Sequence, residues 1–448
     1  MSDHAPVDLA TARAELAAKT PKSQAIAQDR AEILNSGLAA NLEMPHPIFI
    51  ESGSGPYVFD ADGNRYIDTS VGFGLHMLGH VHPEIEAAIK QRTGSGWMFG
   101  IHSTSQLRLA NLLAEASPCA ERVVFCNTGS EATMYAIRAA RGFSGKEKIA
   151  FFDGFYHGAH DYGMWMADPQ SDRSAPEPMA MGHGIPAALK DLTLLLPYRS
   201  PQAFELIREH KDELALVFVE GVQSSNPQAE VGPYLQELAQ VCRECDVLFG
   251  IDEVITGFRI AYGGAQARFG VTPDLATYGK VLGGGLPIGA ITGRAAVMDV
   301  FNGLAAERGI FSGGTFSGNP LTMEAGSAAV SHLAEHPEIY ARLEAQGQRL
   351  ADAVNGFCEA QNIPAQLKHV GSMFHMFFQR EPIHSARDAH NRHLHAQKAF
   401  YLHALNQGVL VPGTQRAFLS AAHTDATVEQ IIAVFQNALL AVAAEDLF

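Results

Sequence analysis

Several features that would mark a special class of protein are scarce in this sequence. It contains five cysteines in 448 residues, and their irregular spacing outlines no disulfide framework. Cys242 and Cys245 form a C-x-x-C pair, but the stretch around them has a helical pattern and no second pair follows. We therefore expect a structural role for this pair rather than a metal or redox role. Basic residues are also few, with 32 Lys and Arg against 48 Asp and Glu and a formal net charge of −16. That balance argues against a nucleic-acid partner, although it leaves room for a local phosphate site.

Long apolar segments are missing as well. No run of about 18 apolar residues occurs, so we expect no membrane-spanning helix. The opening residues, MSDHAPVDLA, include an early acid and no long apolar core, which is not typical of a secretory signal. Together with the unpaired cysteines, these absences predict a reducing, cytoplasmic location.

The residues that are present predict a folded α/β protein of more than one unit. Hydrophobic residues make up 47% of the chain and charged residues 18%, and a single core rarely grows past about 250–300 residues. Residues 8–37 have a helical pattern, and residues 45–70 read as a small antiparallel meander with tight turns. From about residue 320 to 361 the pattern is helical again, and mixed strands and helices follow.

Between residues 80 and 300, short apolar runs alternate with helical stretches. Most of these runs are continuously apolar, which is typical of strands covered by helices on both faces of a mostly parallel sheet. The candidate strands are Arg122–Cys126, Lys148–Phe152, Ala215–Glu220, Val247–Asp252, Leu275–Tyr278 and Gly289–Thr292. Polar residues gather where the runs end, and open α/β sheets bind ligands outside the carboxyl ends of their strands.

The pattern predicts a division of the chain into three segments. Residues 1–75 would form an N-terminal helix and meander that pack with the C-terminal domain, because chain ends tend to lie close together. Residues 76–325 would form the large domain with the central sheet. Residues 326–448 would form the smaller α/β domain.

The first candidate site is the polar turn Asn127–Ala132, which follows the strand ERVVF. Free backbone N–H groups at the start of a helix, joined by hydroxyl groups, suit a phosphate dianion. A plain N-cap is the alternative, because Ser or Thr with a nearby Glu is a common helix start.

The second and third candidates are an acid and a lysine at later strand ends. Asp252 follows VLFGI and either caps a helix or bonds a protonated ring nitrogen, as the carboxylate beside a pyridine cofactor does. Lys280 leads from a strand into the glycine-rich Val281–Pro287. It is either a solvated lysine beside a flexible loop or a nucleophilic amine that forms an imine with an aldehyde. Glycines would let the backbone approach a bulky ring.

In this order of elements and in further motifs, the sequence resembles the class III (ω-) aminotransferases of pyridoxal-phosphate (PLP) fold type I. Within that class it is most similar to the glutamate-1-semialdehyde aminomutase group. The likeness runs from about Pro47 to Thr424. The further matching motifs are Phe59–Asp68 (FDADGNRYID), Leu78–His80 (LGH), Tyr156–Gly158 (YHG), Asp252–Arg259 (DEVITGFR) and Gly314–Pro320 (GTFSGNP).

The resemblance implies a large PLP-binding domain with a mostly parallel sheet, a smaller domain built from both chain ends, and pyridoxal 5′-phosphate as cofactor. Lys280 would be the Schiff-base lysine and proton shuttle, and Asp252 would pair with the pyridine nitrogen. The other implied contacts are Gly129 and Ser130 to the phosphate, Tyr156 and Val254 on the two ring faces, Gln223 at the ring hydroxyl, Glu220 in the pyridine-side network, and Gly314 and Thr315 to the phosphate of the neighbouring subunit. The last contact predicts a homodimer with shared active sites. Ordinary aromatic packing of Tyr156 and a local turn at Thr315 are the plainer alternatives.

Three functions follow as hypotheses. The first is a ping-pong transaminase that moves an amino group from a primary amine or β-/ω-amino acid to a keto acid, so that its partners are small molecules. The second is an aminomutase that moves the group within one molecule. The third, a PLP-fold protein without catalysis, is disfavoured by the intact Lys280 and Asp252.

The sequence departs from the aminomutases where their substrate binds. Asn41–Met44 lacks the Arg of the family motif, and the family's Ser-Trp pair is replaced by Gly72–Phe73. Arg416 is a candidate clamp for a substrate carboxylate, with a solvated arginine as the alternative. Arg259, in the shared motif, is expected to be structural. The C-terminal histidines show no convergent metal set, and we expect them to be solvated and no metal to bind: His384, His390, His393, His395 and His403.

Overall fold

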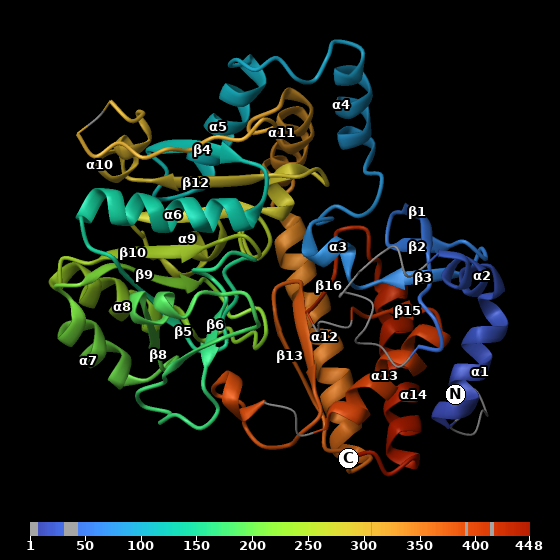
Figure 1. Ribbon diagram of the computed structural model, residues 1–448. Coiled ribbons are helices and arrows are strands. Elements are labelled where there is room, and N and C mark those ends of the chain that lie inside the picture. Colours follow the sequence, from blue (N-terminus) through green and yellow to red (C-terminus); the bar gives the residue numbers. More distant parts are fainter. Residues whose placement is uncertain (1–7, 31–43, 306, 390–392, 413–415) are drawn as a thin grey trace. The chain divides into compact units, whose positions relative to one another are not determined.

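The computed structural model describes residues 8–30, 44–305, 307–389, 393–412 and 416–448 (Figure 1). The chain divides into two compact units. The first contains residues 1–82, 341–382 and 389–448, and the second contains residues 83–340 and 383–388. Both ends of the chain therefore belong to one unit, and the central part forms the other.

The second unit is built on a seven-stranded sheet with the order β4-β12-β11-β10-β9-β5-β8. Its strands are β4 (Arg122–Cys126), β5 (Lys148–Phe152), β8 (Thr193–Leu196), β9 (Leu214–Glu220), β10 (Leu248–Asp252), β11 (Leu275–Gly279) and β12 (Gly289–Gly293). Only β12 runs antiparallel to its neighbours. The predicted α/β class with a mostly parallel sheet is confirmed. The predicted strands are all present, whereas β8 was missed.

Helices of this unit cover the sheet with apolar faces. Helix α6 (Gly129–Ser144) begins at the Thr128 N-cap and ends at Gly145, whose φ of 73° suits a left-handed C-cap. Its alanines pack with Phe151 and Phe218 of the sheet in one buried cluster. The remaining longer helices of the unit are α4 (Pro83–Thr93), α5 (Thr104–Ala116), α7 (Pro201–His210), α8 (Gly232–Glu244), α9 (Gly264–Phe269) and α11 (Pro320–Glu335).

The first unit contains the predicted antiparallel meander, which is confirmed as β1 (Ile50–Ser54), β2 (Tyr57–Asp60) and β3 (Arg65–Asp68). The short strand β15 (Val409–Leu410) extends this sheet in parallel with β3. A second sheet has the order β13-β14-β16 and contains β13 (Gln366–Val370), β14 (Met373–Phe377) and β16 (Ala417–Phe418). The long helices from the C-terminal part of the chain in this unit are α12 (Glu338–Ala360), α13 (Leu394–Asn406) and α14 (Asp425–Ala444).

Prolines interrupt both long helices that the sequence pattern predicted. The segment from residue 8 is divided into α1 (Leu9–Lys19) and α2 (Pro21–Arg30), and its predicted continuation to residue 37 lies outside the described residues. The segment after residue 320 breaks before Pro337 into α11 and α12. Proline has no N–H to continue a helix but fits well at the first turn of the next one.

Within the described part of the chain, α14 is long and apolar enough to cross a membrane by length and composition alone. Half of its most apolar window is buried inside the protein. Val428, Ile431 and Phe435 are buried on this helix. This burial is typical of a helix in the core of the first unit.

Candidate active site

The candidate site lies at the carboxyl edge of the sheet in the second unit. Asp252, the last residue of β10, is in register with Glu220 on β9 and with Thr277 on β11. Lys280 follows β11 directly and begins a short 3₁₀ helix that runs to Gly283. The acid and the lysine predicted from sequence therefore come from neighbouring parallel strands that end at the same edge.

The polar turn Asn127–Ala132 lies against the same edge of the sheet. Glycines in and near this turn show how closely it packs against the residues that follow β10 and β11. A Cβ added to Gly129 would stand 2.8 Å from Val254 Cγ1. A Cβ added to Gly279 would stand 3.3 Å from Val254 Cγ1 and 3.6 Å from Gly129 Cα. The start of α6, the segment after Asp252 and the residue before Lys280 are thus in mutual contact. The structure brings together the elements on which the sequence interpretation depends.

Asp252 is buried, and protein donors contact both of its carboxylate oxygens. Its Oδ2 lies 2.8 Å from His157 Nδ1. Its Oδ1 accepts bonds from Val254 N at 3.0 Å and from Thr277 Oγ1 at 3.1 Å. An ionised carboxylate can accept all of these bonds, which fix the plane of the group.

His157 is a functional candidate that sequence reasoning quoted in a motif without giving it a role. Its ring is buried beside Phe151 and Phe218, with centroid distances of 5.3 Å and 4.7 Å. Because a carboxylate only accepts, the ring nitrogen that faces Asp252 carries the proton. The other nitrogen, Nε2, is buried without a hydrogen-bond partner among the described residues. The only signal in the sequence was a histidine in a polar loop after a buried strand.

The start of α6 combines the two interpretations that the sequence left open. Thr128 caps the helix, because its Oγ1 accepts a bond from Glu131 N at 3.1 Å. The first-turn amides of a helix have no partner within the helix, so those of Gly129 and Ser130 remain donors for an anion. Ser130 Oγ accepts a bond from Ala159 N at 3.0 Å, which leaves its proton to donate elsewhere. Gly158 has a φ of 102°, and a Cβ there would stand 2.8 Å from Ser130 Cα.

Glu220 and Gln223 support the loop that carries the aromatic candidate Tyr156. Buried Glu220 accepts bonds from Tyr156 N at 3.2 Å and from Ser224 N at 2.9 Å. Gln223 is fully buried, and its Nε2 donates to Asp153 O at 3.4 Å. The side chain of Tyr156 is exposed, and its stacking on a cofactor ring stays a prediction.

Gly314 and Thr315 lie between β12 and α11, beside the phosphate turn of their own chain. A Cβ on Gly314 would stand 2.8 Å from Asn127 Nδ2, and the same nitrogen donates to Ser317 Oγ at 3.3 Å. Both Gly314 and Thr315 are exposed. Their contact with a neighbouring subunit stays a prediction.

Lys280 is partly buried and has a φ of 45°, in the left-handed region that a residue with a Cβ rarely adopts. The glycines after it continue with positive φ, 58° at Gly284 and 101° at Gly285. A strained conformation of this kind costs about 1–3 kcal/mol and occurs mostly at functional sites, where surrounding structure enforces it.

Glu253 faces away from the candidate site into the core. It is fully buried and accepts bonds from Thr256 Oγ1, from Ala265 N at 3.0 Å and from Gln266 N at 2.9 Å. Burial raises the pKa of Glu253. Arg259 is also buried, and burial lowers its pKa to about 9, which supports the structural role expected for it.

The remaining predicted residues lie in the first unit. Arg416 stands just before β16 and is partly buried, and its role toward a substrate carboxylate stays a prediction. The Gly72–Phe73 pair lies in a turn whose backbone has positive φ from Val71 to Gly74, and Phe73 is 43% exposed. The segment expected to lack the family arginine, residues 41–43, falls outside the described residues.

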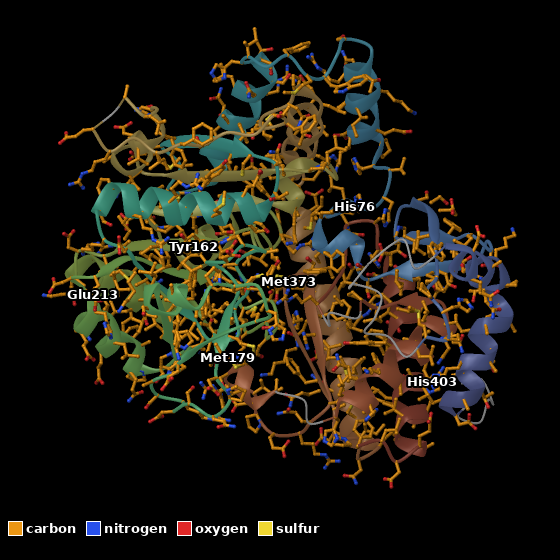
Figure 2. The ribbon with its side chains drawn as sticks, viewed as in Figure 1. His76, Tyr162, Met179, Glu213, Met373 and His403 are labelled. Carbon is orange, nitrogen blue, oxygen red and sulfur yellow. The ribbon has the colours of Figure 1, made fainter. Side chains whose placement is uncertain are left out.

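The expectation about the histidines is partly wrong. His403, labelled in Figure 2, lies on α13. Its side chain is buried, and its Nε2 lies 3.2 Å from Glu445 Oε1. His390 falls outside the described residues. Across the described ranges, no group of His, Cys, Asp and Glu side chains is arranged to hold a metal ion.

Comparison with known proteins gives matches over nearly the whole chain. The family model for aminotransferase class III matches residues 38–439. The glutamate-1-semialdehyde 2,1-aminomutase of Methanocaldococcus jannaschii is 36% identical over 437 residues, covering 94% of this chain and 99% of that protein. An omega-transaminase from Sphaerobacter thermophilus has a TM-score of 0.87 at 31% identity, covering 94% of this chain and 98% of that one. A beta-phenylalanine aminotransferase from Variovorax paradoxus has a TM-score of 0.82 at 30% identity, covering 95% of each chain.

Proposed function

Because the chain belongs to the class III aminotransferases, a family of PLP-dependent enzymes, we propose that it moves an amino group between two carbons of one small substrate. The cofactor is PLP. Curated relatives at 35–40% identity are named glutamate-1-semialdehyde 2,1-aminomutase. They support this intramolecular reaction better than the transaminase reaction that the sequence analysis put first.

The proposal rests on one observation: the polar turn at the start of α6, Asp252 and Lys280 lie together at one edge of the sheet. The residues there fit PLP. The amides of Gly129 and Ser130 suit its phosphate. The oriented carboxylate of Asp252 suits a protonated ring nitrogen, and glycines at positions 129, 158 and 279 leave no side chain in the way.

The residues of the chain would divide the work of the reaction. When bound, PLP supplies an electron sink for negative charge on the substrate carbon. Asp252, held by His157 and Thr277, would accept a hydrogen bond from the protonated ring nitrogen. Lys280 Nζ would hold the cofactor, and the same amine would take the proton from the substrate carbon and return it.

An intermolecular transaminase is the second candidate, and specific observations favour it. Gly72–Phe73 replaces the Ser-Trp pair expected of an aminomutase, and Phe73 is 43% exposed in its turn. The omega-transaminase and the beta-phenylalanine aminotransferase also match this chain at 31% and 30% identity. If this candidate holds, β-/ω-amino acids are the donors to test, and Arg416 is the proposed carboxylate clamp.

One experiment separates the two candidates. PLP-loaded protein is incubated with glutamate-1-semialdehyde alone, and in parallel with β-phenylalanine plus pyruvate or 2-oxoglutarate. The aminomutase predicts conversion of the semialdehyde to its isomer without any keto acid. Turnover that occurs only with a keto acid would overturn it in favour of the transaminase. Lys280→Ala should be inactive in every arm.

A further inference from the structure

A polar cavity lies in the second unit, between the C-terminal end of α4, the start of α5 and the middle of α11. Its volume is about 340 Å³, and none of its lining residues belongs to the candidate active site. The lining residues that matter here are Arg92, Ser95, Arg108, Glu324, Ser327 and Ser331. Cavities that bind small molecules start at about 300 Å³, so this one suits a small metabolite more than a nucleotide or a coenzyme.

The charge in the cavity is positive once its ion pair is counted. Glu324 Oε2 lies 2.7 Å from Arg108 Nη1, and Ser105 Oγ donates to Glu324 Oε1 at 2.6 Å. Both oxygens of this carboxylate are therefore engaged, and its charge is balanced by Arg108. Arg92 has no acid within ion-pair distance among the described residues, and its guanidinium lies 5.2 Å from the ring centroid of Phe99. One uncompensated guanidinium remains, in a chain whose net charge is −16.

Two buried polar atoms of the lining residues have no hydrogen-bond partner among the described residues. They are Arg92 Nε and Ser327 Oγ, and both are shielded from solvent. Ser327 is only 4% exposed. Buried polar groups are nearly always hydrogen-bonded in native proteins, because leaving them unpaired is costly. These atoms sit on two different helices, α4 and α11, and both belong to residues that line the cavity.

We propose that this cavity is a binding site for a small oxyanion, the carboxylate or phosphate group of a metabolite that takes no part in the amino transfer. A guanidinium and several hydroxyl groups all offer donors, and oxyanions are the ligands that accept from such a set. The site touches the catalytic segment through α11. The backbone of α11 packs closely against the 3₁₀ helix that Lys280 begins. A Cβ added to Gly326 of α11 would clash with Leu282 O, and one added to Gly284 would meet the backbone of Ala325. An oxyanion bound at Ser327 would hold α4 against the same helix that packs on that segment.

The test uses the PLP-loaded full chain, so that the cofactor already fills its own phosphate site. Inorganic phosphate and succinate are titrated separately by calorimetry at constant ionic strength. We expect one molecule of at least one probe to bind per chain in the millimolar range or tighter. Phosphate binding alone would assign a phosphate ligand, and succinate binding alone a carboxylate. Failure of both probes to bind would overturn the proposal.

Variants locate the bound probe. Arg92→Gln and Ser327→Ala should each weaken binding by roughly tenfold, because each removes one donor from the acceptor. Arg208→Gln is the matched control, since Arg208 is an exposed helical arginine on α7 with a distant partner, Glu244 at 3.8 Å. Equal affinity of Arg92→Gln and Arg208→Gln would place the probe elsewhere and refute the site.

Hydrogen exchange gives a readout that needs no activity. The bound probe should slow exchange in the last turn of α4 and the middle of α11, and leave α7 unchanged. Should Ser327→Ala fail to fold, Arg92→Gln still decides the outcome, because Arg92 is only partly buried in the last turn of its helix. Unchanged exchange in α4 and α11 at saturating probe would also overturn the proposal.

Discussion

Replacement of His157 by Phe should weaken PLP binding while leaving the fold intact. The substitution removes the bond from Nδ1 to Asp252 Oδ2, which is 2.8 Å long, and keeps an aromatic ring packed beside Phe151 and Phe218. A hydrogen bond to a charged group contributes about 1.5–3 kcal/mol. Since each 1.4 kcal/mol is about tenfold in an equilibrium constant and the bond is present before the cofactor binds, the loss of affinity should be at most about a hundredfold. Val254 N and Thr277 Oγ1 still donate to the other oxygen, so the loss should not be complete.

The assay measures the dissociation constant of PLP by titrating the apoprotein and following the visible absorbance of the lysine-bound cofactor. His157→Asn is the conservative control, because its amide can still donate toward Asp252 and should recover much of the affinity. The kcat of the saturated His157→Phe enzyme should fall as well, because the carboxylate is less firmly held. Wild-type affinity and an unchanged absorbance band in His157→Phe would refute a role for this bond in holding the cofactor.

The remaining predictions test other parts of the site and the fold. Lys280→Ala should abolish the visible absorbance band while the protein still binds PLP, and persistence of the band would show that another amine carries it. Gly158→Ala, at a φ of 102° and against Ser130, should raise the PLP dissociation constant in the same titration. If Thr315 reaches a neighbouring subunit, mixing inactive Lys280→Ala with a weakly active Thr315→Val protein should restore activity through mixed dimers, and no recovery would contradict shared sites. Burial lowers the pKa of His423 to about 4. Between that pH and the ordinary histidine pKa of 6.5, the unfolded chain binds a proton at this side chain and the folded chain does not. Stability should therefore fall as pH drops from about 6.5 to 4, by about 1.4 kcal/mol per unit for this group. His423→Asn should flatten that slope in urea titrations, and an unchanged slope would contradict the assignment to His423.

The sequence was most informative where one physical signal dominated. Strands of the central sheet are continuous apolar runs because helices cover both faces, and their predicted ends agree closely with the structure. Strand β8 escaped notice because its four residues, TLLL, are too few to stand out from a neighbouring helical pattern. The breaks at Pro21 and Pro337 could have been predicted, since each proline begins or directly precedes a new helix.

Pairings between distant residues could not be read from the sequence. His157 and Asp252 lie far apart in the chain, and nothing local in the motif YHG says that the histidine is buried or which strand end it faces. The burial of His403 is of the same kind, because its partner Glu445 lies on the far side of α14 in the chain. The polar residues around His403 in the sequence predicted that its side chain would be exposed to solvent. Its burial depends on residues that only the tertiary fold brings next to it.

The two adjacent acids, Asp252 and Glu253, show how the fold assigns different tasks to like groups. The extended chain continues past β10, because Glu253 N donates to Thr277 O at 2.8 Å, and successive side chains of an extended segment point to opposite sides. Asp252 and Val254 therefore face the candidate site, and Glu253 faces the core. There the donors around α9 satisfy its oxygens, and burial raises its pKa. A second carboxylate on the site side would compete for the same ring nitrogen. Under the proposed function, the alternation of the strand leaves Asp252 for the cofactor, while Glu253 holds the strand end in place.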